Sequence, residues 1–209
     1  ENYEVCCSYD KSSWFRHKTE LAHDSLAIVI QPTRDIIYFA YFAPYTLEQH
    51  SKLIASSLNS EFCRHEVLGN TIENRAIELI KFSNNLDSKR KKACWIIARQ
   101  HPGETMSEWW MEGLIEQLVD GPKTFVKKLL EDCDIYLVPN MNPDGSYKGN
   151  LRTNAAGRNL NREWETPSLK KSPEVYFVKR KMLETGVDFF LDIHGDESLP
   201  YCFIAGTEG

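Results

Sequence analysis

The stretch that decides the fold is Ala93-Cys-Trp-Ile-Ile-Ala98, followed at once by Arg99-Gln-His-Pro-Gly-Glu104. Its first six residues are apolar and rich in β-branched and aromatic side chains, which is typical of a buried central strand. Its last six residues carry an imidazole and a carboxylate on either side of a tight Pro-Gly turn. A central strand that ends in such polar residues predicts a functional loop at the edge of a sheet.

Further strands and helices alternate on both sides of this stretch. Strands are predicted over residues 76–82, 135–138 and 187–193, and helices over 106–118, 125–129 and 172–186. The last helix has a strong start, because Ser172 stands in the capping position, Pro173 at the first helical position and Glu174 in the first turn. This alternation predicts an α/β fold with a mostly parallel or mixed sheet and helices on both faces.

The first 45 residues have a different pattern. The runs 26–30 and 36–42 are apolar and flank a turn at Pro32, so they predict an antiparallel pair of strands. Thr46 then begins a helix, with Gln49 in the capping-box position and Leu47, Ser51, Ile54 and Leu58 on one face. We therefore expect a small, incomplete β-sandwich-like domain over residues 1–45 and a second domain over residues 46–209.

Composition excludes several classes of protein. A net charge of −5 argues against a nucleic-acid surface, and we interpret the basic clusters 89–92 and 179–181 as a solvated turn and an outer helix face. No apolar run reaches 18 residues, so no membrane partner is expected. The six cysteines lack paired spacing, which predicts reduced thiols, a cytoplasmic protein and no cysteine ligands to zinc.

Three residues at strand ends form a candidate metal set. His101 and Glu104 follow the strand 93–98, and His194 directly ends the strand 187–193. Two histidines and one glutamate, with a fourth position left to water, are the usual ligands of catalytic zinc. Taken alone, a H-x-x-E pair is common by chance, and a single histidine at a strand end is more often structural.

A polar loop strengthens the metal hypothesis. Residues 148–164 are rich in glycine and asparagine and carry Arg152, Arg158 and Arg162. Arginine presents a planar fork that suits a carboxylate, and loops carry function more often than cores do. The alternative is an exposed loop with solvated arginines.

Five stretches, in order, carry a resemblance to a known family. They are His101-Pro-Gly-Glu104, Asn142-Pro-Asp-Gly145, Gly149-Asn-Leu-Arg152, Gly157-Arg-Asn-Leu-Asn-Arg-Glu-Trp164 and Asp192-Ile-His-Gly195. The chain resembles the zinc carboxypeptidases over roughly residues 36–209, and most of all their cytosolic carboxypeptidase branch with its bacterial members. Five motifs in sequence are far more specific than any one of them.

The resemblance implies a role for each matching residue. His101, Glu104 and His194 would bind one Zn²⁺ per chain, and Asn159 would orient the first histidine where many relatives have an aspartate. Arg152 would stabilise the oxyanion and contact the substrate. Asn161 and Arg162 would bind the substrate's terminal carboxylate. The implied activity is hydrolysis of the C-terminal peptide or isopeptide bond of a peptide or protein, with acidic residues as candidate leaving groups.

The general base of the family is not found in this chain. It is a glutamate well downstream of the last zinc histidine, and Glu197 and Glu208 lie too close to His194 to take that place. We therefore expect the catalytic domain to be truncated at its C-terminus.

Two other functions fit the same residues. A module that binds C-terminal carboxylates without hydrolysis, and a zinc amidase or acylase that acts on small N-acyl compounds, would both need a carboxylate-binding pair such as Asn161 and Arg162. A downstream glutamate distinguishes the first alternative from a peptidase, and a substrate panel distinguishes the second.

Overall fold

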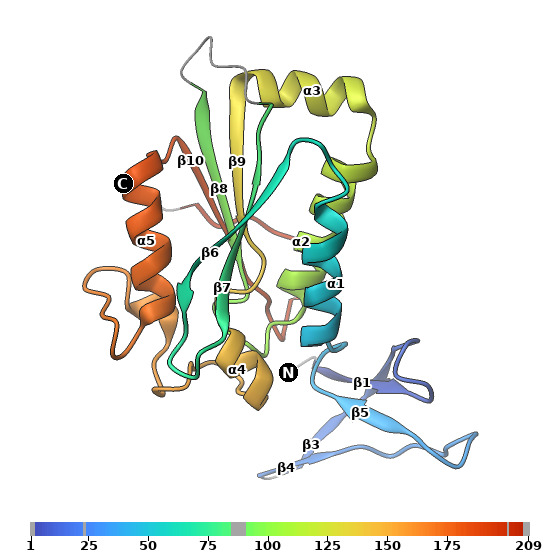
Figure 1. Ribbon diagram of the computed structural model, residues 1–209. Coiled ribbons are helices and arrows are strands. Elements are labelled where there is room, and N and C mark those ends of the chain that lie inside the picture. The colour runs from blue at the N-terminus through green and yellow to red at the C-terminus, as the bar shows by residue number, and fades with distance from the viewer. Residues whose placement is uncertain (1–2, 23, 85–90, 200, 207–209) are drawn as a thin grey trace. The chain divides into compact units, whose positions relative to one another are not determined.

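The computed structural model describes residues 3–22, 24–84, 91–199 and 201–206 (Figure 1). The chain divides into two compact units, Glu1–Pro44 with Gly195–Gly209, and Tyr45–His194. Glu208 and most of the turn expected over residues 84–92 lie outside the described residues. The assignment of two domains to residues 1–45 and 46–209 stays a prediction.

The first unit contains a small antiparallel sheet, as predicted, with the strand order β2-β1-β5. Its strands are β1 (Glu4–Ser8), β2 (Phe15–Lys18) and β5 (Tyr38–Ala40), and β3 (Glu20–Ala22) pairs separately with β4 (Ser25–Ala27).

The predicted pairing of residues 26–30 with 36–42 is wrong. The first run contributes to β4 and pairs with β3, whereas the second forms β5 and pairs with β1. The physical reason lies in β1, whose Cys6 and Cys7 are buried opposite Ala40 and Phe39. β1 therefore offers β5 an apolar partner that the sequence pattern around residues 26–30 does not reveal.

The second unit is a five-stranded mixed sheet with the order β10-β8-β9-β7-β6. Its strands are β6 (Cys63–Asn70), β7 (Ala76–Phe82), β8 (Lys92–Ala98), β9 (Cys133–Val138) and β10 (Phe189–Ile193). β10, β8 and β9 run parallel, and β7 is antiparallel to both β9 and β6. β6 was not predicted, because it is an edge strand whose exposed residues, such as Arg64 and Glu66, interrupt the apolar pattern.

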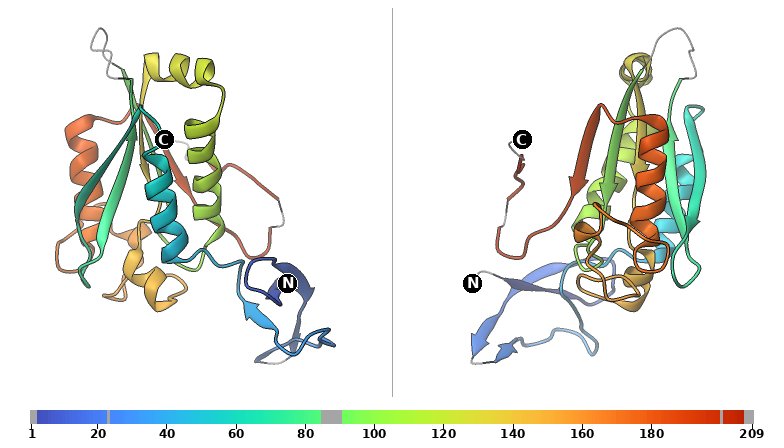
Figure 2. Two further views of the ribbon diagram at one scale, coloured as in Figure 1. Left: turned by 45° about the vertical axis from the view of Figure 1, so that its right-hand side comes forward. Right: turned by 90° about the vertical axis from the view of Figure 1, so that its left-hand side faces the viewer.

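Helices cover both faces of this sheet, as predicted (Figures 1 and 2). One face packs against α1 (Leu47–Ser57), α2 (Met106–Asp120) and α3 (Lys123–Asp132), and the other against α5 (Pro173–Thr185). Alternation along β8 divides the core between them: Ile96 and Ala98 face α1 to α3, whereas Trp95 and Ile97 face α5. The central strand is thus buried on both sides.

The helix ends agree with the sequence better than the helix faces do. Thr46 and Gln49 form the predicted capping box of α1. In α2, however, the predicted stripe of every fourth residue is wrong at Trp110, which is 43% exposed, because a helix turns every 3.6 residues and the buried row shifts to Met111 and Ile115.

Ser172 occupies the predicted N-cap position of α5, ahead of Pro173, but its hydroxyl accepts from the Ser168 amide and makes no capping hydrogen bond. The six cysteines, all within the described residues, are free thiols, as predicted. None of the helices in the described ranges is both long and apolar enough to cross a membrane.

Candidate metal centre

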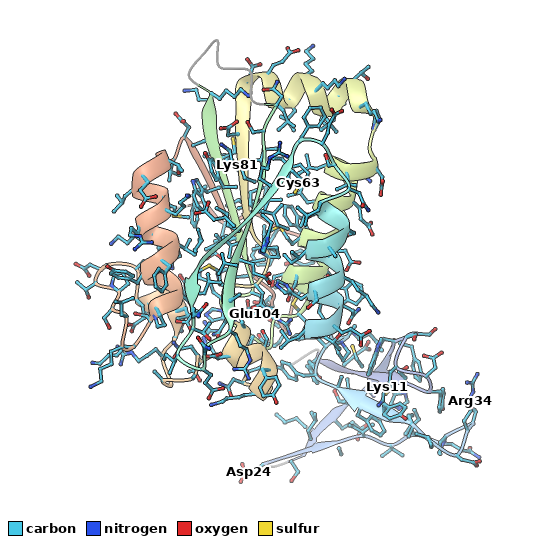
Figure 3. All side chains as sticks on the ribbon, viewed as in Figure 1. Lys11, Asp24, Arg34, Cys63, Lys81 and Glu104 are labelled. Carbon is cyan, nitrogen blue, oxygen red and sulfur yellow. The ribbon has the colours of Figure 1, made fainter. Side chains whose placement is uncertain are left out.

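Three strand exits meet at one edge of the sheet. Parallel pairing places Ile193 opposite Ala98, and the Met141 amide donates to the Ala98 carbonyl at 2.9 Å. The residues that follow β8, β9 and β10 therefore leave the sheet together. Figure 3 labels Glu104 near α4 (Pro143–Lys148), at the end of the sheet opposite to Lys81.

The three residues predicted to hold zinc lie together at this edge. Glu104 has one carboxylate oxygen 2.8 Å from His101 Nδ1 and the other 2.9 Å from His194 Nδ1. The two Nδ1 atoms are 3.1 Å apart, and one donor atom from each residue lies within 4.8 Å of the others. Two imidazole nitrogens and a carboxylate facing one point fit Zn²⁺, which prefers nitrogen, sulfur and carboxylate ligands.

Two acidic neighbours of His194 shift the pKa of its imidazole. Burial alone would lower the pKa of His194, but hydrogen bonds to Asp192 and Glu104 outweigh it and raise the pKa to about 9. His101 and Glu104 are almost completely buried, so the Glu104 carboxylate acts on the His101 imidazole with little screening by water.

Each histidine has a partner on its other ring nitrogen. Asn159 Oδ1 lies 3.0 Å from His101 Nε2, so the structure places Asn159 beside the histidine that the family resemblance implied it would orient. Asp192 Oδ2 lies 2.7 Å from His194 Nε2, a contact that the sequence reasoning missed. A signal was present, because residues two apart on a strand point to the same side, and Asp192 precedes His194 by two.

The His101–Glu104 turn packs closely against Asn142–Gly145, the first turn of α4 with its N-cap. The Gly103 amide donates to the Leu151 carbonyl at 2.9 Å. A Cβ added at Gly145 would lie 2.4 Å from Pro102 Cγ and 2.7 Å from the Thr153 carbonyl oxygen. Glycine at position 145 is therefore required by close approach of the two turns.

Most of the Asn142–Gly145 motif has a structural task. The Asn142 amide donates to the Gln100 carbonyl, which ties the exit of β9 to the exit of β8. Asp144 is fully buried and accepts from the Thr71 hydroxyl and the Arg75 guanidinium, each at 2.7 Å. It thereby fastens the β6–β7 hairpin to α4.

The three arginines of the polar loop lie in different surroundings. Arg152 is half exposed, with its guanidinium 3.6 Å from the Glu104 carboxylate. Arg158 is bound by the Glu163 carboxylate at 2.7 Å. Arg162 is exposed and donates to the Asn161 carbonyl at 3.0 Å, and the Asn161 amide lies 3.5 Å from His194 Nε2. Arg152 and Asn161 thus border the metal centre directly, whereas Arg158 is engaged in an ion pair.

A buried ion pair next to the His101–Glu104 turn was also missed. Arg99 Nε donates to the Pro102 carbonyl at 3.0 Å, and Arg99 Nη1 lies 2.5 Å from Glu108. Glu108 in turn contacts His50 Nδ1 at 2.6 Å. Charged residues in a polar stretch usually predict a surface, so composition alone could not find this cluster.

Comparisons with known proteins agree with this geometry. Residues 51–199 match the zinc carboxypeptidase family model, and residues 1–42 match the cytosolic carboxypeptidase N-terminal domain. An uncharacterized protein from Zymomonas mobilis is 43% identical over the whole chain, and bovine cytosolic carboxypeptidase 3 is 34% identical over 85% of it.

Two solved structures extend the likeness to three dimensions. A metallo-carboxypeptidase from Burkholderia cenocepacia superposes with a TM-score of 0.91 at 44% identity, over 96% of this chain and 54% of that one. A Pseudomonas aeruginosa metallo-carboxypeptidase in complex with (2-guanidinoethylmercapto)succinic acid gives 0.89 at 48% identity, over 96% of this chain and 53% of that one.

The chain spans 53% of the length of the Zymomonas relative and 19% of the bovine one. The family model nevertheless matches most of the chain, and it covers the strand exits that carry His101, Glu104 and His194. The chain belongs to the zinc carboxypeptidase family.

Proposed function

We propose that the protein hydrolyses the C-terminal peptide bond of peptides or proteins, with one zinc ion per chain held by His101, Glu104 and His194. The observation that supports this most is the convergence of these three donors within 4.8 Å at the common exit of parallel strands. Zinc at this position would supply a Lewis acid and a water of lowered pKa.

The neighbouring side chains have distinct parts in the proposed reaction. Arg152, which lies 3.6 Å from Glu104, donates to the scissile carbonyl oxygen as negative charge develops there. Asn161 and Arg162, adjacent on the 3₁₀ helix η1 (Leu160–Arg162), bind the terminal carboxylate of the substrate. Asn159 keeps the ring of His101 in place through its contact with Nε2.

Two finer features belong to the same proposal. Acidic C-terminal residues are the preferred leaving groups, which the exposed cations Arg152 and Arg162 support by their charge. The protein works in the cytoplasm, which its free cysteines support.

A substrate panel tests the proposal in the natural polypeptide that contains this chain. A peptide that ends in glutamate with a free carboxylate should release its last amino acid, and a zinc chelator should stop the release. The same peptide with a C-terminal amide, and small N-acyl amino acids, should be poor substrates. Equal cleavage of the amidated peptide, or faster cleavage of the N-acyl compounds, would overturn the proposal.

A further inference from the structure

A chain of three hydrogen bonds leads from the polar loop to His194. Trp164 Nε1 donates to Gln100 Oε1 at 2.8 Å, and Gln100 Nε2 donates to Asp192 Oδ2 at 2.6 Å. The same oxygen of Asp192 lies 2.7 Å from His194 Nε2. Gln100 itself is only 1% exposed, so water has little access to the middle of this chain.

Trp164 determines which atom donates and which accepts in each of these three hydrogen bonds. An indole N–H can only donate, so the atom of Gln100 that faces Trp164 must be the carbonyl oxygen. The amide nitrogen of Gln100 then faces Asp192, whose carboxylate accepts. Asp192 accepts again from His194, which places the ring proton on Nε2.

With zinc bound, this direction would leave the lone pair of His194 Nδ1 facing the ion. Nδ1 is the atom that lies 2.9 Å from Glu104 and 3.1 Å from His101 Nδ1. Asp192 contacts its two neighbours through Oδ2 alone, while Oδ1 is buried and has no hydrogen-bond partner among the described residues. The hydrogen bonds of this carboxylate are therefore directed to Gln100 and to the histidine.

The two histidines are supported unequally. His101 has the neutral amide of Asn159 on its outer nitrogen, at 3.0 Å, whereas His194 has the carboxylate of Asp192. A charged acceptor forms a shorter and stronger hydrogen bond than a neutral one and raises the basicity of the ligand more. His194 is also the more exposed of the two rings. Without the hydrogen bond to Asp192, its side chain would therefore be freer to move than that of His101.

We propose that Gln100 and Asp192 are positioning residues of the metal centre. They hold His194 with Nδ1 directed at the ion, and Trp164 sets the direction of their hydrogen bonds. This inference rests on the proposed zinc site but adds residues that do not touch the ion.

The test measures zinc affinity in the natural polypeptide by competition with a chromogenic chelator. Asp192→Ala should weaken zinc binding about 10- to 100-fold, and Gln100→Leu about tenfold. Thermal unfolding of each metal-free variant checks that it is folded, and Asp192→Asn replaces Asp192→Ala if the latter does not fold.

A double-mutant cycle separates positioning from general damage. If Gln100 acts through Asp192, Gln100→Leu should weaken zinc binding in the wild-type background but add nothing in the Asp192→Ala background. Thr185→Val is the matched control. It removes a 3.1 Å hydrogen bond that another indole, Trp95 Nε1, donates to the Thr185 hydroxyl, and this bond does not involve the site. This control should bind zinc like the wild type.

The outcomes distinguish the inference from the proposed function. Wild-type zinc affinity in both Asp192→Ala and Gln100→Leu, or additive losses in the double variant, would overturn the positioning role while leaving the zinc site intact. Failure of the wild type to bind zinc would instead contradict the proposed function.

Discussion

The guanidinium of Arg99 lies 2.5 Å from the carboxylate of Glu108, and both side chains are buried. Arg99 also has a φ of 58°, a left-handed conformation that favours glycine. Its other contacts, to the carbonyls of Pro102 and Tyr45, explain why the arginine is held there. This ion pair fixes the start of the turn that carries His101 and Glu104.

Removing the guanidinium should destabilise the fold strongly. Arg99→Ala leaves the buried Glu108 without one of its charged partners, and breaking such a pair typically costs about 3–5 kcal/mol in the free energy of unfolding. Arg99→Gly should cost about 1–2 kcal/mol less than Arg99→Ala, because glycine removes the backbone strain. Urea denaturation measures both. Equal losses would show that the positive φ carries no strain.

The network around His50 predicts a pH-dependent stability. Burial would lower the pKa of His50, but its hydrogen bonds to Glu108 and Glu78 raise it to about 9 from an ordinary 6.5. A raised pKa stabilises the folded state fully below pH 6.5, and this contribution is lost as pH rises through 9.

The comparison of wild type with His50→Gln isolates this effect. The difference in free energy of unfolding between the two should be largest near pH 6 and smallest near pH 9.5. Denaturant titrations at several pH values measure it. A difference that stays constant over this range would contradict the charged state of His50.

The sequence predicted the central strand and placed the candidate metal ligands beyond strand ends because both depend on local patterns. Ala93–Ala98 is apolar on both faces, His194 directly follows β10, and His101 and Glu104 lie in the loop that follows β8. Because β8, β9 and β10 are parallel, their carboxyl ends lie at the same end of the sheet.

Features that depend on register or on long-range partners could not be predicted. Gln100 contacts Asp192 because Ile193 pairs with Ala98 in the parallel strands β10 and β8. This register cannot be predicted from the pattern of residues in the two strands. Arg99 and Glu108 are charged residues of the kind that usually lies at the surface. Only the folded chain shows that they form an ion pair in the interior. The pairing of β5 with β1 was missed for the same reason.

Adding one methyl group at Gly145 should damage the metal centre. The new Cβ would lie 2.4 Å from Pro102 Cγ, so the turn that carries His101 and Glu104 would have to move. We expect Gly145→Ala to cost about 1–3 kcal/mol in the free energy of unfolding and to weaken zinc binding.

Gly113→Ala is the control for this substitution. Gly113 lies in α2, and a Cβ there would meet nothing within 4 Å, so alanine should stabilise the helix by about 0.5–1 kcal/mol. Unchanged stability and zinc affinity in Gly145→Ala would refute the close fit of the two turns.

The two arginines proposed to contact substrate should differ in kinetics. Arg152→Ala should lower kcat about 10²- to 10³-fold, because its contact strengthens as the oxyanion forms. Arg162→Ala should mainly raise KM for substrates with a free terminal carboxylate. Steady-state assays on the natural polypeptide, with free and amidated termini, measure both. The same proportional loss for the two termini in Arg162→Ala would argue against its carboxylate contact.

The central claim is that His101, Glu104 and His194 hold one zinc ion. Metal analysis after exhaustive dialysis tests it most directly, with the wild type beside His101→Ala, Glu104→Ala and His194→Ala. We predict about one zinc per wild-type chain and a sharp loss in each variant. Full zinc content in all three variants would contradict the assignment.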